Sequence, residues 1–109
     1  MKMFQDAHLE IKKYFSGYFE TNPYEAGWAD EAIFFVNVEK TEGDPVFTGQ
    51  VQLSQDGVSW ASDGSAPVSF SGEGLHLIKV HPNFGNYLRL AVSIEGGKML
   101  LNIHIACKG

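Results

Sequence analysis

The chain has 109 residues, of which 44% are hydrophobic and 13% aromatic, so we expect one domain over residues 1–109 with its own hydrophobic core. Eight Lys and Arg residues against 13 Asp and Glu residues give a formal net charge of −5, which argues against nucleic acid and anionic membranes as partners. The lone cysteine, Cys107, excludes an intramolecular disulfide and is predicted to be a buried, inert thiol.

The beginning of the chain lacks the apolar region of a signal peptide. No run approaches the roughly 18 consecutive apolar residues that a membrane span requires. We therefore expect a protein that is made in the cytoplasm without a signal peptide.

Almost every segment alternates apolar and polar residues with the period of two that is typical of half-buried strands. The run 31–38 is the most apolar and is rich in β-branched and aromatic residues, which indicates a central strand. Segments rich in Gly, Pro and Asx separate the runs about every ten residues, as in a β-sandwich or barrel. In chain order, the predicted strands are residues 8–15, 31–38, 48–54, 75–80, 87–94 and 98–106.

Two dipeptides are predicted to form hairpin turns. Asp56-Gly57 supplies the positive φ of a tight turn, ahead of a return strand that carries Trp60. Gly96-Gly97 is expected to close the hairpin between the last two strands, and segment 41–45 is expected to be a loop. The result is an all-β, antiparallel β-sandwich of seven to nine strands in two packed sheets. The residues expected inside are Leu9, Ile11, Phe34, Val36, Val51, Leu53, Leu88, Leu90, Val92, Ile103 and Ile105.

One motif carries a family resemblance. Residues 54–60 read S-x-D-G-x-x-W, and residues 87–90 follow as Tyr-Leu-Arg-Leu. This pattern resembles discoidin-like sandwiches, and still more the small virion-associated sandwich proteins of tailed bacteriophages, over residues 15–106. The resemblance implies a jelly-roll or discoidin-like fold and a virion-associated role. Discoidin domains proper are longer and cross-linked by cysteines, a pair that this chain lacks.

The best candidate binding residues are three aromatic side chains. Tyr24 and Trp28 lie in the irregular segment 22–30, and Tyr18 lies shortly before it. Aromatic faces stack on sugar rings and anchor protein interfaces, although aromatic capping of the sandwich end explains the cluster equally well. We expect Trp28 or Tyr24 to be at least partly exposed, or buried only against another subunit.

Other conspicuous residues favour structural roles. Trp60 is expected to pack over the core, and Arg89 to form a structural ion pair or to lay its stem over apolar surface. The four histidines lack the spacing of a zinc site, and Asp56, Asp63 and Glu73 lack that of an EF-hand calcium loop. No catalytic arrangement is recognisable, so we expect neither an enzyme nor a cofactor.

These observations favour a non-enzymatic protein that works by surface contact. The leading hypothesis is a bacteriophage virion accessory subunit, for capsid decoration or attached to the tail. Its expected location is the virion, and its expected partners are a capsid or other virion protein and further copies of itself. The alternative is a carbohydrate-binding module that binds a glycan through Trp28 and Tyr24.

Overall fold

The computed structural model describes residues 4–109, and their side chains from residue 7 onward apart from residues 10 and 11. Ile11, which was expected to face inward, therefore lies outside the described side chains. The described residues contain no helix, and so none that could cross a membrane. Their seven strands are β1 (Phe4–Glu20), β2 (Tyr24–Glu25), β3 (Glu31–Ser54), β4 (Ala61–Ser62), β5 (Val68–Phe70), β6 (Gly74–Lys79) and β7 (Tyr87–Lys108).

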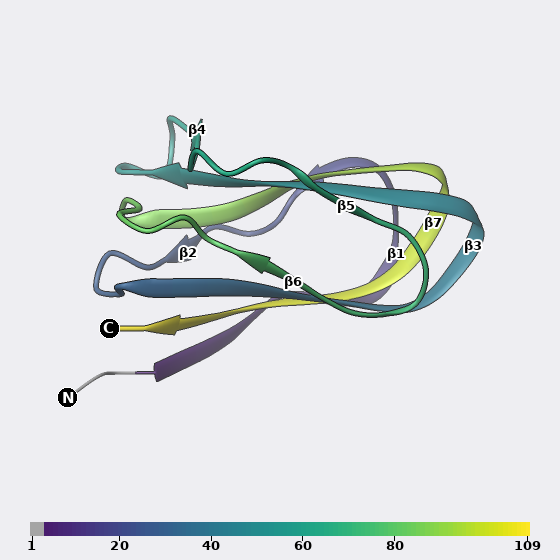
Figure 1. The fold of residues 1–109 in the computed structure, drawn as a ribbon, viewed down its shortest axis with the longest axis horizontal. Helices are drawn as coiled ribbons and strands as arrows, with labels where there is room; N and C mark the ends of the chain where they lie inside the picture. Colours follow the sequence, from purple (N-terminus) through teal and green to yellow (C-terminus); the bar gives the residue numbers. More distant parts are fainter. Residues whose placement is uncertain (1–3) are drawn as a thin grey trace.

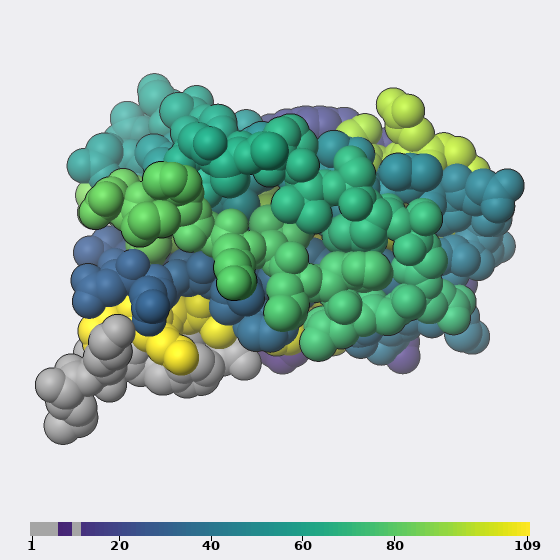
Figure 2. All heavy atoms as spheres, in the orientation of Figure 1, coloured from purple at the N-terminus to yellow at the C-terminus, as the bar shows by residue number. Residues whose placement is uncertain are grey.

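All strands belong to one antiparallel sheet, which confirms the all-β antiparallel prediction. β7 is the centre of the sheet because it pairs with β1 on one side and with β3 on the other. The short strands β4, β5 and β6 pair one after another along the opposite edge of β3. Figure 2 shows the segment from β4 to β6, in teal and green, spread over the near side of the molecule.

The three long strands bend in the middle, so that one sheet forms both layers of the molecule. β1, β3 and β7 have 17, 24 and 22 residues, and Figure 1 shows them turning together at one end of the fold. The pairing of β3 with β7 shifts register between Gly43 and Val46, beside the pair Gly43–Gly97. Gly96 has a φ of 90°, a value that side chains with a Cβ disfavour.

Two of the expected turns are therefore bends inside strands. Gly96-Gly97 does not close a hairpin, because residues 87–108 form a single strand whose two halves both pair with β3. Segment 41–45 likewise lies within β3 and is not a loop between strands. A strand bends sharply at such bulges, and here the bends fold the sheet onto itself without forming two separate sheets.

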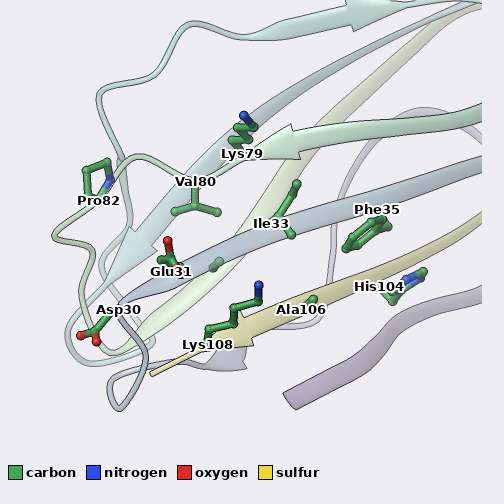
Figure 3. A pocket seen from close by; sticks show the side chains of 11 residues that line it. Asp30, Glu31, Ile33, Phe35, Lys79, Val80, Pro82, His104, Ala106 and Lys108 are labelled. Atoms are coloured by element: carbon green, nitrogen blue, oxygen red, sulfur yellow. The ribbon is translucent and has the colours of Figure 1, made fainter. Parts of the chain in front are cut away.

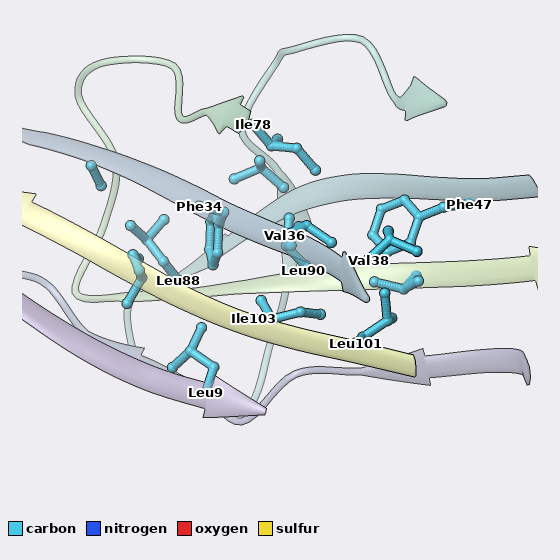
Figure 4. Packing of buried hydrophobic residues seen from close by; sticks show 14 of the residues in the cluster. Leu9, Phe34, Val36, Val38, Phe47, Ile78, Leu88, Leu90, Leu101 and Ile103 are labelled. Atoms are coloured by element: carbon cyan, nitrogen blue, oxygen red, sulfur yellow. The ribbon is translucent and has the colours of Figure 1, made fainter. Parts of the chain in front are cut away.

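The core lies between the two layers. Burial alternates along both halves of β3 and β7, and the buried residues of the two halves belong to one cluster (Figure 4). Leu53 is only partly buried at the edge of that cluster, since its strand neighbour on one side is the two-residue strand β4. The inward-facing prediction is confirmed for Leu9, Phe34, Val36, Val51, Leu88, Leu90, Val92, Ile103 and Ile105.

The hairpin between β3 and β4 is present, but its loop spans residues 55–60 and is longer than a tight turn. The Ser54 hydroxyl accepts a hydrogen bond from the Gly57 amide at 2.8 Å. Asp56 Oδ1 accepts bonds from the amides of Ser59, at 2.9 Å, and Val58, at 2.8 Å. The two amide bonds to Asp56, first that of Ser59 and then that of Val58, hold the pKa of this carboxyl group below its usual value.

Candidate functional site

The structure does not bring the three predicted binding residues into one cluster. Tyr18 lies on β1 with 63% of its surface exposed, while the neighbouring Phe19 packs against the core. Tyr24, on β2 opposite Leu88, and Trp28, in the turn that follows, both pack against the core cluster with part of each residue exposed. The expected partial exposure of Trp28 and Tyr24 is therefore confirmed, but Tyr18 points away from the core.

The segment that carries Trp28 is held by backbone hydrogen bonds. The Ala26 amide donates to the carbonyl oxygen of Asn86 at 2.7 Å, and the Ala29 amide donates to that of Ala26 at 3.0 Å. The Asp30 amide donates to the carbonyl oxygen of Lys108 at 2.7 Å. The loop is therefore tied to the residue before β7 and to the last residue of β7, and its aromatic residues pack against the core cluster.

Arg89 is the centre of a polar strip on the outer surface of the layer that contains Tyr18. Its Nε donates to Gln52 Oε1 at 2.8 Å, and its Nη2 lies 3.4 Å from Glu20 Oε2. Its guanidinium lies 4.1 Å from the centre of the Trp60 ring. The Tyr18 hydroxyl donates to Glu20 at 2.9 Å, and this bond raises the pKa of the tyrosine.

This strip confirms the structural ion pair expected for Arg89 and corrects the expectation for Trp60. Trp60 precedes β4 and stacks on Arg89, whose side chain lies opposite the buried Leu88 and Leu90, so the indole packs on the outer face rather than over the core. The guanidinium is already bound by an acid, an amide and a ring. Two of its nitrogens, Nε and Nη2, thus contact side chains of the chain, and the indole covers one face of the guanidinium plane.

The outer surface of the other layer carries apolar side chains that the described part of the chain leaves partly exposed. Ile33 and Phe35 of β3 alternate with the buried Ala32 and Phe34, and so point away from the core with part of their surface exposed. Phe35 pairs with Leu77 of the edge strand β6, and Asn37 pairs with Leu75. Leu75 and Leu77 are 59% and 50% exposed, respectively. We call Ile33, Phe35, Leu75 and Leu77 the outer apolar face.

A groove of about 600 Å³ lies at one end of this face. Ile33 and Phe35 line it from β3, with Val80 and Pro82 from the segment after β6 (Figure 3). Charged side chains line its rim, with two lysines (Lys79 and Lys108) and two acids (Asp30 and Glu31). The volume is within the range of about 300–1,000 Å³ for small-ligand pockets, but the groove is open to solvent.

Histidines border the apolar face on the β7 side. The ring of His104 stacks on Phe35 at 4.9 Å between centroids, and the ring of His8 lies 5.3 Å from His104. Within the described residues, Nδ1 of His104 has no hydrogen-bond partner, and no three His, Cys, Asp or Glu residues come together as metal ligands.

Burial raises the pKa of the Cys107 thiol to about 11, which matches the inert thiol predicted.

Sequence reasoning missed the outer apolar face, although a signal for it was present. Residues 32–36 are apolar on both sides of the strand, a pattern that was interpreted as a central strand. β3 is indeed a central strand, but only one side of its first half is covered by the core. The alternating leucines of β6 were likewise visible, and no sequence pattern shows which side of a strand is left uncovered.

Comparisons with known proteins bear on the fold alone. No protein-family model and no curated protein sequence matches the chain. Among solved structures, the crystal structure of the SPBc2 prophage-derived protein YomS matches 100% of this chain and 96% of that one, with a TM-score of 0.52 and 8% sequence identity. The chain is therefore similar in fold to a prophage-derived protein.

Proposed function

We propose that this chain is a non-enzymatic bacteriophage structural protein, a virion accessory subunit that acts by docking onto other proteins. The observation that carries the proposal is the outer apolar face, which holds two leucines at least half exposed on a regular sheet. Soluble proteins that expose contiguous apolar side chains on a regular element mostly use them for protein contacts. The fold similarity to a prophage-derived protein supports the phage context.

The charge distribution favours a protein partner over nucleic acid. The chain carries a formal charge of −5, and the groove rim holds equal numbers of acids and lysines. Binding to a phosphate backbone requires a basic stripe, because affinity there comes from neutralising phosphates. An apolar face with a balanced set of charges beside it instead suits contact with another apolar protein surface.

The proposal is tested on phage particles. Particles from the strain that carries the gene, purified on a density gradient after infection or induction, are probed for the chain by mass spectrometry and by an antibody. We expect the chain in the particle fractions at a fixed ratio to the major capsid protein. Its presence only in the soluble lysate would contradict the virion role.

One observation favours a glycan-binding function as a second candidate. Tyr18 is 63% exposed beside Glu20 and Arg89, so an aromatic ring and planar polar groups lie on one open sheet surface. In that case Tyr18→Ala should abolish binding on a glycan array while Trp28→Ala, which removes a residue packed against the core, should chiefly lower the melting temperature. Absence of any array signal for the unmodified chain would exclude this candidate.

A further inference from the structure

A smaller depression lies on the outer surface of the layer that contains Tyr18. Its volume is about 280 Å³, and it is lined by two residues of β3 and two of β7, namely Val46, Thr48, Ser93 and Glu95. These residues form two pairs of the two strands, Val46 with Glu95 and Thr48 with Ser93. Phe47 and Ile94, which lie between them in sequence, are buried. Because side chains alternate along a strand, the four lining side chains point outward.

Tyr18 lies beside this depression. It pairs with Ser93 of β7, and 63% of the tyrosine is exposed. Directly opposed residues of an antiparallel pair have Cβ atoms about 4.5–5.5 Å apart. The Tyr18 hydroxyl donates to Glu20, two residues further along β1, and the ring does not line the depression. A small hydroxyl side chain inside the depression and a large exposed aromatic ring outside it are therefore neighbours.

Hydroxyl groups cross the sheet at this level. Tyr18, Ser93, Thr48 and Ser69 are paired in turn across β1, β7, β3 and β5. The hydroxyls of Thr48 and Ser69 share a hydrogen bond of 2.9 Å. Within the described residues, the Ser93 hydroxyl and the Glu95 carboxylate have no hydrogen-bond or ion-pair partner. A hydroxyl both donates and accepts, whereas a carboxylate only accepts, so the depression offers both kinds of partner to a ligand rich in hydroxyls.

The charge of the depression disfavours an anionic ligand. Glu95 is the one charged residue among the four that line it. The Arg89 guanidinium on the same surface already lies 3.4 Å from Glu20. A phosphate, sulfate or carboxylate group in the depression would be repelled by Glu95, since like charges at short range repel. A neutral hydroxyl instead donates a strong hydrogen bond to that carboxylate.

We propose that this depression and the exposed ring of Tyr18 form one binding site for a neutral oligosaccharide. One sugar ring occupies the depression, with its hydroxyls on Ser93 and Glu95, and the next sugar packs its apolar side on the tyrosine ring. The depression is just below the about 300–1,000 Å³ of small-ligand pockets, which suits a single sugar ring. The inference rests on the second candidate function, glycan binding, and gives it a site and a ligand class.

The first test is a titration of the isotope-labelled full chain followed by NMR. The probes are neutral methyl glycosides of glucose, galactose, mannose and N-acetylglucosamine, and the disaccharides maltose, cellobiose, lactose and chitobiose, each up to about 50 mM to include millimolar affinities. We expect the amide signals of Tyr18, Thr48, Ser93 and Glu95 to shift, and a disaccharide to bind more tightly than its single sugar. Methyl glucuronide, which carries a carboxylate, should bind at least about 10-fold more weakly than methyl glucoside.

The second test uses two variants in the depression and two matched controls. Ser93→Leu fills the depression, whereas Ser71→Leu adds the same side chain in the exposed segment between β5 and β6. Glu95→Gln removes the carboxylate charge, and Glu73→Gln does the same in that exposed segment. We expect Ser93→Leu to abolish the shifts and Glu95→Gln to weaken binding at least about 10-fold, the loss of one hydrogen bond to a charged group. Both controls should bind like the unmodified chain, and circular dichroism melting verifies that all four are folded.

The outcomes separate this site from glycan binding in general. Absence of shifts with every neutral probe, or a glucuronide bound as tightly as the glucoside, would overturn the inference. Shifts confined to the surroundings of Arg89 and Trp60, with Ser93→Leu and Glu95→Gln binding normally, would refute this site and keep the glycan-binding candidate. The particle experiment is independent of all these results, so the virion role stands or falls by itself.

Discussion

At the scale of single residues, Arg89 is a well-shielded charge on the outer surface of the sheet. It contacts Glu20, Gln52 and Trp60, and only 16% of its side chain is exposed. Lys98 makes the same kinds of contact, an ion pair with Glu42 at 3.4 Å and a ring contact with Tyr14 at 5.0 Å, but its side chain is 49% exposed. Substituting each residue therefore shows how much burial adds to the stabilisation that such contacts give.

We predict that Arg89→Ala lowers the free energy of unfolding by about 2 kcal/mol, since it removes a charged hydrogen bond and a shielded cation–π contact. Lys98→Ala should cost at most about 0.5 kcal/mol, because solvent screens an exposed pair. Urea denaturation monitored by circular dichroism gives both values. Equal losses in the two variants would show that burial of the Arg89 contacts contributes nothing.

Cys107 gives a second residue-scale prediction. Its thiol is buried on β7 and its pKa is raised to about 11, from 9.0 for an unperturbed thiol, because desolvation disfavours the thiolate. The native protein should thus stay unlabelled by a thiol reagent at pH 8, and should react at once in denaturant. Because the pKa is higher in the folded state than in the unfolded state, deprotonation of Cys107 favours unfolding. The stability that the neutral thiol contributes is therefore present below pH 9 and is lost as the pH rises towards about 11. Rapid labelling of the native protein would contradict the buried position.

At the scale of elements, the bends in the long strands explain how one sheet makes two layers. The bend of β7 lies against that of β3, and a Cβ on Gly96 would lie 2.5 Å from the carbonyl oxygen of Asp44. Gly64 provides a matched control, because its φ of 94° is close to the 90° of Gly96 but nothing lies within 4 Å of its Cβ position. Alanine at Gly64 measures only the free-energy cost of positive φ. Alanine at Gly96 adds the cost of the steric clash.

Gly64→Ala should destabilise the protein by about 1 kcal/mol, the cost of positive φ for a residue with a Cβ. Gly96→Ala should cost at least about 3 kcal/mol, because it adds a clash between the new Cβ and the backbone of β3 at the bend. Thermal and urea unfolding measure both. If the two substitutions cost the same, close packing at the bend is not what selects glycine there.

At the scale of the whole molecule, the two layers share their strands and their core. Trp28 packs against the core cluster next to β2, whereas Trp60 lies on the outer surface of the layer that carries Arg89. Since β3 and β7 run through both layers, neither layer can lose its pairing without loosening the other. The protein should therefore unfold as one unit.

We predict that the variants Trp28→Phe and Trp60→Phe each show coincident urea transitions by tryptophan fluorescence and by far-ultraviolet circular dichroism. In each variant the fluorescence reports the tryptophan that remains, while circular dichroism reports the whole sheet. A fluorescence transition of Trp60 at clearly lower urea than the loss of strand signal would contradict unfolding in a single step.

The sequence by itself determined most of the strand segments and which side of β3 and β7 faces the core. The period of two makes that choice locally, and it placed Leu88, Leu90 and Val92 correctly inside. It also singled out Trp60 and Arg89, residues far apart in the chain, but could not bring them together, because their stacking depends on the pairing of β4 and β7 with β3.

Only the tertiary structure decided what the glycines at residues 96 and 97 do and which strand faces stay uncovered. A hairpin turn and a bend within a strand both need positive φ, so the local sequence is the same for either. The outcome depends on whether the two flanking segments pair with each other or, as here, with a common neighbour, β3. The outer apolar face has the same cause. When one sheet folds onto itself, Phe34 is enclosed between the two layers and Phe35 points outward. No other segment in the described part of the chain covers Phe35 fully.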